Sequence, residues 1–187
     1  MERTEGGVYF TSFPASLRSG VSGVIDQNHA VVTVFSGSSG SGGHTSMFLE
    51  MFENGNPKSY FIDLTTNGTA ISISKSPAQI FPPNGNAINM SLPKGGNLLA
   101  LARSHHHSYP ITGAQAAALL LAVQRFKDKV QAGRYAYVKP GGAIGRVLTR
   151  PGKRGVNCAD FAIKVLSEAG ITNISSLAFN TPYRVAK

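Results

Sequence analysis

The sequence predicts an α+β fold, in which an antiparallel sheet from the first part of the chain packs against helices from the last part. Runs rich in β-branched and aromatic residues dominate the first 75 positions and show no helical period. A regular apolar stripe at helical spacing begins after Thr112, and a second helical segment follows Asn157. This order of strands first and helices later is typical of the α+β class.

Length and composition set the outer limits. A chain of 187 residues with 42% hydrophobic residues suits one compact domain over residues 1–187. The longest apolar run, residues 114–123, is shorter than the ~18 residues that a spanning helix needs, so we expect no stable membrane insertion. The first residues include Glu2 and Glu5 and lead into no apolar segment. We therefore expect a protein made in the cytoplasm without a signal peptide.

Five segments are predicted to be strands, at residues 8–13, 30–35, 44–52, 59–65 and 69–74. Asn54 and Gly55 separate the third from the fourth, and Asn-Gly is a strong hairpin signal, so these two strands should pair in antiparallel orientation. Residues 36–43 have the Gly/Ser composition of a flexible linker. Residues 77–108 hold four prolines and no clear period, and we interpret them as loops that could form an insertion.

Both predicted helices begin with a recognisable cap. Thr112 and Gln115 have the spacing of a capping box, and the apolar stripe behind them ends near Gly133. Asn157 is a favourable N-cap for the second helix, which should end at Gly170. Cys158 then falls on the core-facing side of the first turn of this helix.

Positive charge is concentrated in one stretch of the chain. The net charge is +9, and 11 basic residues accompany a single acid between Lys94 and Arg154. Such a field favours anionic partners, among them nucleic acid, anionic lipid, an acidic polymer or an acidic protein. Ordinary solubility charge is the alternative explanation.

The single cysteine is the candidate nucleophile. Cys158 has no second cysteine with which to form a disulfide or a multi-cysteine zinc site. A thiol at a helix N-terminus is stabilised as thiolate by the macrodipole, and the preceding Arg150, Lys153 and Arg154 act in the same direction. The competing interpretation is a small buried hydrophobic residue, because free cysteine is among the most buried residue types.

A cysteine nucleophile needs a base and a group that orients the base. His44 follows Gly43 at the start of a predicted strand, from which an imidazole can project toward a facing helix N-terminus. Asp63 lies on the strand that the hairpin folds back beside it, and Ser59 or Asn67 could serve in its place.

These residues resemble the permuted papain-like cysteine hydrolases, which include NlpC-like and lecithin-retinol acyltransferase-like enzymes. The resemblance rests on Gly-His at a strand start, the hairpin after it, and the later helix that begins Asn-Cys-Ala-Asp-Phe, with His preceding Cys along the chain. It covers residues 44–63 and 109–171, roughly half of the chain.

The resemblance implies that Cys158 is the nucleophile, His44 the base and Asp63 the orienting third member. It implies acyl transfer without cofactor or metal, on peptidoglycan amides or lipid esters, with an amidase or peptidase favoured. Arg150, Lys153 and Arg154 would bind an anionic polymer, lipid or protein substrate. A peptidoglycan activity without a signal peptide suggests a bacterial toxin or effector, exported by a specialised secretion system and partnered by that machinery or a cognate immunity protein.

Two alternatives stay open. A non-catalytic basic module could bind nucleic acid or anionic lipid, although few aromatic residues accompany the basic ones. The run His105, His106, His107 is a possible metal site, but adjacent residues of an extended segment point to opposite sides, so we expect no metal there. The role of these histidines is left open.

Overall fold

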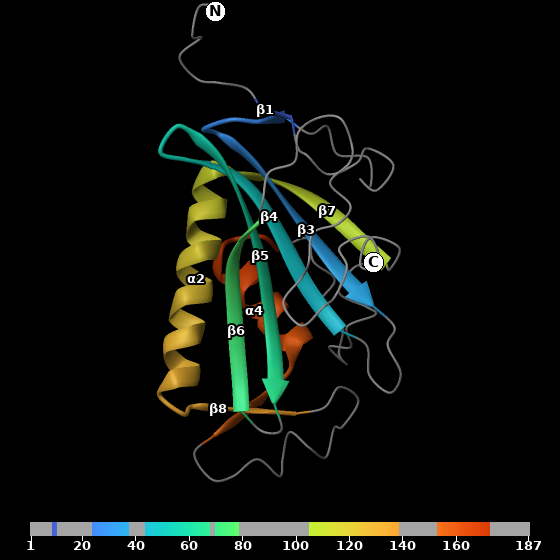
Figure 1. Cartoon of the computed structure of the whole chain (residues 1–187), viewed down its shortest axis with the longest axis vertical. Coiled ribbons are helices and arrows are strands. Elements are labelled where there is room, and N and C mark those ends of the chain that lie inside the picture. Colours follow the sequence, from blue (N-terminus) through green and yellow to red (C-terminus); the bar gives the residue numbers. More distant parts are fainter. Residues whose placement is uncertain are drawn as a thin grey trace, which may run out of the picture.

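A five-stranded antiparallel sheet forms the centre of the structure, a computed structural model that describes residues 9–10, 24–37, 44–67, 70–78, 105–138 and 153–172 (Figure 1). Its strand order is β6-β5-β4-β3-β7. The strands are β3 (His29–Gly37), β4 (His44–Glu53), β5 (Asn56–Asn67), β6 (Ala70–Ala78) and β7 (His105–Thr112). Two helices pack against this sheet, α2 (Gly113–Gln131) and α4 (Cys158–Glu168). The predicted α+β class, with an antiparallel sheet and later helices, is confirmed.

The hairpin between β4 and β5 fixes the register of the central strands. Asn54 and Gly55 both have positive φ, at 52° and 75°, which matches the twist of a tight two-residue turn. Glu53 then pairs with Asn56, and further along the ladder Ser46 pairs with Asp63. The predicted antiparallel pairing of these two strands is therefore confirmed.

Apolar side chains from the strands and helices form one core. The helix-facing positions of the sheet alternate along each strand, and those buried against the helices include Val32, Val34, Met47, Leu49, Ile62 and Leu64. The intervening residues Phe35, Phe48 and Phe61 are buried as well. Burial of both faces explains why β3 and β4 read as nearly continuous apolar runs in the sequence.

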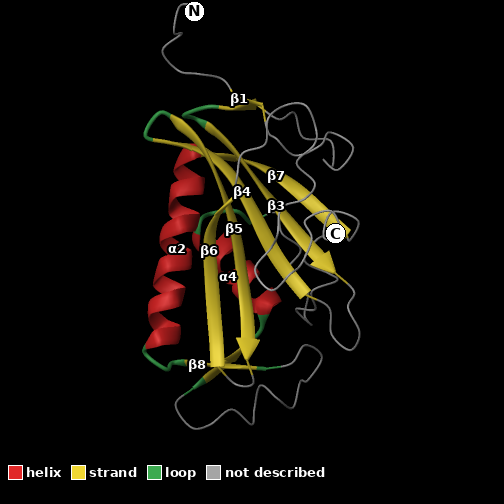
Figure 2. Ribbon diagram, in the orientation of Figure 1, coloured by secondary structure: helices red, strands yellow, loops and turns green. Residues whose placement is uncertain are grey.

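The helices meet the sheet on one face and contact each other (Figure 2). Phe126 of α2 packs edge-on against Phe161 of α4, with ring centroids 4.9 Å apart. Gln115 Nε2 donates to the Gly170 carbonyl over 3.1 Å, which ties the start of α2 to the end of α4. No helix in the described part of the chain is long and apolar enough to cross a membrane.

Two small sheets flank the central one. The strands β1 (Tyr9–Phe10) and β2 (Val24–Ile25) pair in antiparallel orientation, and β8 (Tyr135–Tyr137) pairs in parallel with β9 (Arg154–Val156). Because Asn157 alone separates β9 from α4, the β8 strand lies beside the start of that helix.

The loop interpretation of residues 77–108 is wrong at both ends. The strand β6 extends to Ala78, and β7 begins at His105 and pairs with β3; residues 79–104 lie outside the described ranges. The sequence did not indicate β7 because three consecutive histidines and Pro110 are unusual in a strand. An edge strand such as β7 tolerates a proline because one row of its backbone groups needs no partner. Ser36 and Gly37 of the Gly/Ser tract belong to β3, and residues 38–43 are not described.

Candidate active site

A capping box places Cys158 at the first position of α4. The Asn157 side chain accepts from the Asp160 N–H over 2.9 Å, and the Asp160 carboxylate accepts from the Asn157 N–H over 3.2 Å. Asn157 has an extended backbone, so the helix begins at the next residue. The Cys158 side chain is fully buried and forms no disulfide. Its backbone N–H points out of the helix end, where it has no intrahelical acceptor.

His44 and Asp63 meet across the hairpin. Ser46 stands directly opposite Asp63, so His44, two residues back along β4, occupies the diagonal position on the same side of the strand pair. Asp63 Oδ1 lies 2.6 Å from His44 Nε2. The carboxylate is 7% exposed and the imidazole 34%.

The two alternatives for the third member lie elsewhere. Ser59 pairs with Glu50, six residues along β4 from His44. Asn67 pairs with Ala70 in the next ladder, and its side chain is outside the described set. Of the three candidates, Asp63 therefore has the hydrogen bond to His44.

The second neighbour of His44 is the thiol. Hydrogen bonding and charge from Cys158 both act on the His44 imidazole, and because Asp63 occupies Nε2, Nδ1 is the ring nitrogen left for the sulfur. Burial disfavours the imidazolium, but the hydrogen bonds to Asp63 and Cys158 and the charges of both groups outweigh burial and raise the pKa of His44 to about 10. With this pKa, the imidazole of His44 is protonated at neutral pH.

Tyr137 is a fourth member of this cluster that the sequence did not indicate. Tyr137 pairs with Val156, two residues before Cys158, and its half-buried side chain lies near enough to the thiol for Cys158 to act on its pKa. Burial, the charge and hydrogen bond of Cys158, and the charge of Asp63 together raise the pKa of Tyr137 to about 12. The phenol thus remains a neutral hydrogen-bond donor over the physiological range.

Signals for Tyr137 in the sequence were weak. The segment Tyr135–Tyr137 has period-2 spacing of its aromatic rings, but three residues are too few for a periodicity argument. Its position follows from the parallel pairing of β8 with β9, and from Tyr135, which stacks on Phe126 at 4.6 Å between ring centroids. Such pairing between separate segments cannot be derived from either segment alone.

The predicted substrate-binding cations are only partly described. Lys153 and Arg154 are exposed at the start of β9, four to five residues before the thiol. Arg150 lies outside the described residues. The three histidines fall on β7, where the ring of His107 contacts that of Tyr109 in a tilted arrangement, and the side chains of His105 and His106 are not described.

The arrangement can support nucleophilic chemistry at sulfur. A buried thiol, an imidazole bonded on both nitrogens, a carboxylate and a phenol converge at the N-terminus of α4. Comparison of the chain with protein-family models, curated proteins and solved structures found no match.

Proposed function

We propose that the chain is a cysteine-dependent acyl-transfer enzyme, and that an amidase or peptidase reaction is favoured over a lipid esterase or acyltransferase reaction. The observation that carries this proposal is the unbroken series of contacts from Cys158 through His44 to Asp63. A nucleophile, a base and a group that orients the base are the minimum set for covalent acyl transfer.

In the first half-reaction, the Cys158 thiolate attacks the carbonyl carbon of an amide and a C–S bond forms. The carbonyl π electrons move to oxygen, which becomes an oxyanion. His44 Nδ1–H then donates its proton to the leaving nitrogen, the C–N bond breaks and an amine departs. The products are a thioester on Cys158 and a neutral His44, whose Nε2–H remains directed at Asp63.

The second half-reaction regenerates the pair. His44 Nδ1 accepts a proton from water as the water oxygen attacks the thioester carbon. The tetrahedral intermediate collapses with cleavage of the C–S bond, which releases a carboxylic acid and restores the thiolate beside the imidazolium. Asp63 is a positioning residue in this scheme, because it touches His44 and not the reacting carbonyl.

Two donors are available for the oxyanion. The Cys158 N–H lies at the positive end of the α4 dipole, where anions are stabilised. The Tyr137 hydroxyl interacts with the sulfur in the resting site. Once the sulfur has attacked the substrate carbonyl carbon, the hydroxyl can donate to the oxyanion on that carbon instead. Because Cys158 is fully buried, the groups that cover the thiol must move before a substrate carbonyl can reach it.

The assignment to a permuted papain-like fold belongs to the same proposal. Its support is the chain order His44, Asp63, Cys158, with the histidine on a strand and the cysteine at a helix start. Two further parts of the proposal rest on the resemblance alone. One is an anionic substrate such as peptidoglycan or lipid, and the other is delivery as a secreted bacterial effector with an immunity partner.

An acyl-capture experiment tests the proposed function. Because Cys158 is the single cysteine, any thioester must form there. Incubation with p-nitrophenyl acetate, followed by intact-mass measurement, should show one acyl group that hydroxylamine removes. We expect His44→Ala to slow its formation by at least about 100-fold.

The matched control is a second histidine-aspartate pair. His29 Nδ1 lies 2.8 Å from Asp26 Oδ1, but the His29 side chain is 67% exposed. His29→Ala should therefore acylate at the wild-type rate. Equal rates in His44→Ala and the wild type, with both chains folded, would exclude His44 as the base.

One observation favours a second candidate, a non-catalytic basic binding module. The complete burial of Cys158 is also what a structural thiol would show. A chain that is folded yet forms no thioester with p-nitrophenyl acetate supports this module instead of the enzyme.

A further inference from the structure

Three exposed cations adjoin one another where β8 and β9 begin. Arg134 precedes β8, Lys153 precedes β9 and Arg154 is the first residue of β9. The Arg154 N–H donates to the Arg134 carbonyl over 2.9 Å, so these backbones are direct neighbours. We call Arg134, Lys153 and Arg154 the basic edge.

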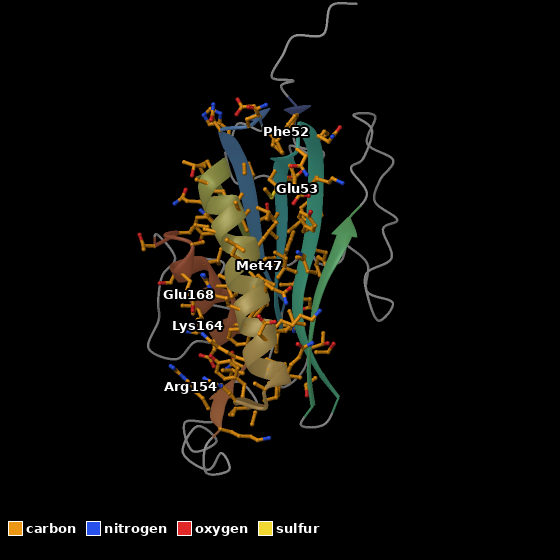
Figure 3. All side chains as sticks on the ribbon, turned by 90° about the vertical axis from the view of Figure 1, so that its left-hand side faces the viewer. Met47, Phe52, Glu53, Arg154, Lys164 and Glu168 are labelled. Carbon is orange, nitrogen blue, oxygen red and sulfur yellow. The ribbon has the colours of Figure 1, made fainter. Side chains whose placement is uncertain are left out.

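The basic edge differs from two cations on the helices, although Lys127 and Lys129 of α2 also have no ion pair among the described residues. Arg125 and Lys164 both lie near Glu168, at 3.6 and 3.1 Å, whereas no residue of the basic edge has an ion-pair partner within the described ranges. Figure 3 shows Glu168, Lys164 and Arg154 in succession along one side of the molecule. Like charges in close proximity repel, so this clustering opposes folding and folding stability does not explain it.

The basic edge also lies close to the thiol. Arg154 and Cys158 are four residues apart, so their Cα atoms are separated by at most about 14 Å. Four residues of an extended substrate would cover the same distance. An anionic group held at the basic edge would therefore sit within about four residues of a bond attacked by Cys158.

We infer that the basic edge binds an oxyanion, a carboxylate or a phosphate, carried by an extended substrate chain within about four residues of the amide that Cys158 attacks. An arginine can bind such a group in a bidentate manner, and Arg134 and Arg154 lie at the starts of two paired strands whose backbones are in direct contact. This inference depends on the proposed function only for the bond that is cleaved, and binding at the basic edge needs no reaction.

The surroundings favour a soluble chain over a membrane or a nucleic acid. The large exposed apolar residue of the described part is Leu121 on α2, and a peripheral membrane surface needs a wider apolar face next to its cations. The neighbouring Tyr135 stacks on Phe126 and is not free to stack on a base.

Fluorescence anisotropy with short labelled peptides tests the inference in the full chain. The probes are a glutamate-rich peptide, its glutamine counterpart and a phosphoserine peptide, each of about six residues so that one end can reach Cys158. At low salt we expect the anionic peptides to bind at least about tenfold more tightly than the glutamine peptide. Arg134→Gln combined with Arg154→Gln should reduce that ratio to within about twofold.

A charge-matched variant controls for net charge. Lys58→Gln with Arg125→Gln removes two cations away from β8 and β9 and should preserve the ratio. Comparison of the glutamate and phosphoserine peptides identifies the preferred oxyanion. Equal binding of all three peptides, or an equal loss in both double variants, would overturn the inference. The inference would also be overturned if none of the peptides bound and the chain instead bound anionic vesicles in a manner that depends on Arg134 and Arg154.

The two proposals can fail separately. Peptide binding is measured both in the wild type and in Cys158→Ser, where no thioester can form. Selective anion binding without acyl capture contradicts the proposed function and supports the inference about the basic edge. Acyl capture without selective binding contradicts only the inference about the basic edge.

Discussion

Both helices begin with a capping box, but the two helix starts have different surroundings. Thr112 with Gln115 and Asn157 with Asp160 both form complete capping boxes, so each helix has a sharply defined first residue. In α2 that residue is Gly113, whose N–H donates to the Asn28 carbonyl over 2.9 Å. In α4 it is Cys158, whose N–H has no backbone acceptor in the described part of the chain.

The contrast extends to the side chains. A Cβ on Gly113 would collide with the Gln27 carbonyl oxygen, so the start of α2 lies directly against the backbone of the preceding segment. The start of α4 instead faces the polar side chains of His44 and Tyr137. A helix start with its N–H already bonded anchors the fold, whereas one whose N–H has no backbone acceptor among the described residues, and which carries a thiol, can stabilise developing negative charge. Changes at the two starts should therefore separate stability from chemistry.

The largest effect on the reaction is expected from Asp63→Ala. Loss of the carboxylate frees the imidazole to rotate and should slow acylation of Cys158 by about 100-fold or more. Asp63→Asn can still accept from Nε2–H and should restore part of the rate.

The pH profile distinguishes orientation from charge at this position. Asp63 helps to raise the pKa of His44 to about 10, so the imidazolium is present below that pH and lost above it. Asp63→Asn removes the negative charge, and the upper limb of the pH–rate profile should move toward the ordinary value of 6.5. An unchanged upper limb would show that Asp63 does not act on the charge of His44.

Tyr137→Phe should have the next largest effect on the same reaction. The ring and its packing remain, but the hydroxyl donor next to the sulfur is lost, so we expect acylation to slow by about tenfold to 100-fold. Tyr135→Phe removes a hydroxyl from the same strand and should leave the rate unchanged. If both variants lose activity equally, the effect comes from β8 as a whole and the Tyr137 hydroxyl has no special role.

Gly113→Ala should show the opposite behaviour. The added methyl group collides with the Gln27 backbone, and relief of that contact should lower the free energy of unfolding by about 1–3 kcal/mol. Below the unfolding transition, acylation of Cys158 should keep its wild-type rate. Urea unfolding and acyl capture on the same preparation measure both quantities, and a slower reaction with unchanged stability would remove the distinction between the two helix starts.

The smallest effects are expected at the caps themselves. Thr112→Ala and Asn157→Ala should each lower the free energy of unfolding by about 1 kcal/mol. Only Asn157→Ala should also slow acylation, because fraying of the first turn of α4 displaces Cys158 from His44. Equal acylation rates in the two variants would show that the cap of α4 does not position the thiol.

The same contrast explains what could be predicted from the sequence. The α4 start and the His44–Asp63 contact follow from short-range signals, a capping box and an Asn-Gly turn whose register brings Asp63 beside His44. Tyr137 could not be found because its position depends on the pairing of two three-residue strands from separate segments. The β7 strand was missed because its polar histidines and Pro110 lack the usual strand pattern, and only the ladder with β3 reveals it.

The contact between His44 and Cys158 is tested most directly by NMR titration of the His44 imidazole in the wild type and in Cys158→Ala. With both partners in place the midpoint should lie near pH 10, because Asp63 and Cys158 both stabilise the imidazolium. In Cys158→Ala the midpoint should fall, since one hydrogen bond and one negative charge are lost, while His29 should titrate identically in both chains. A His44 midpoint that is the same with and without the thiol would contradict a reactive Cys158–His44 pair.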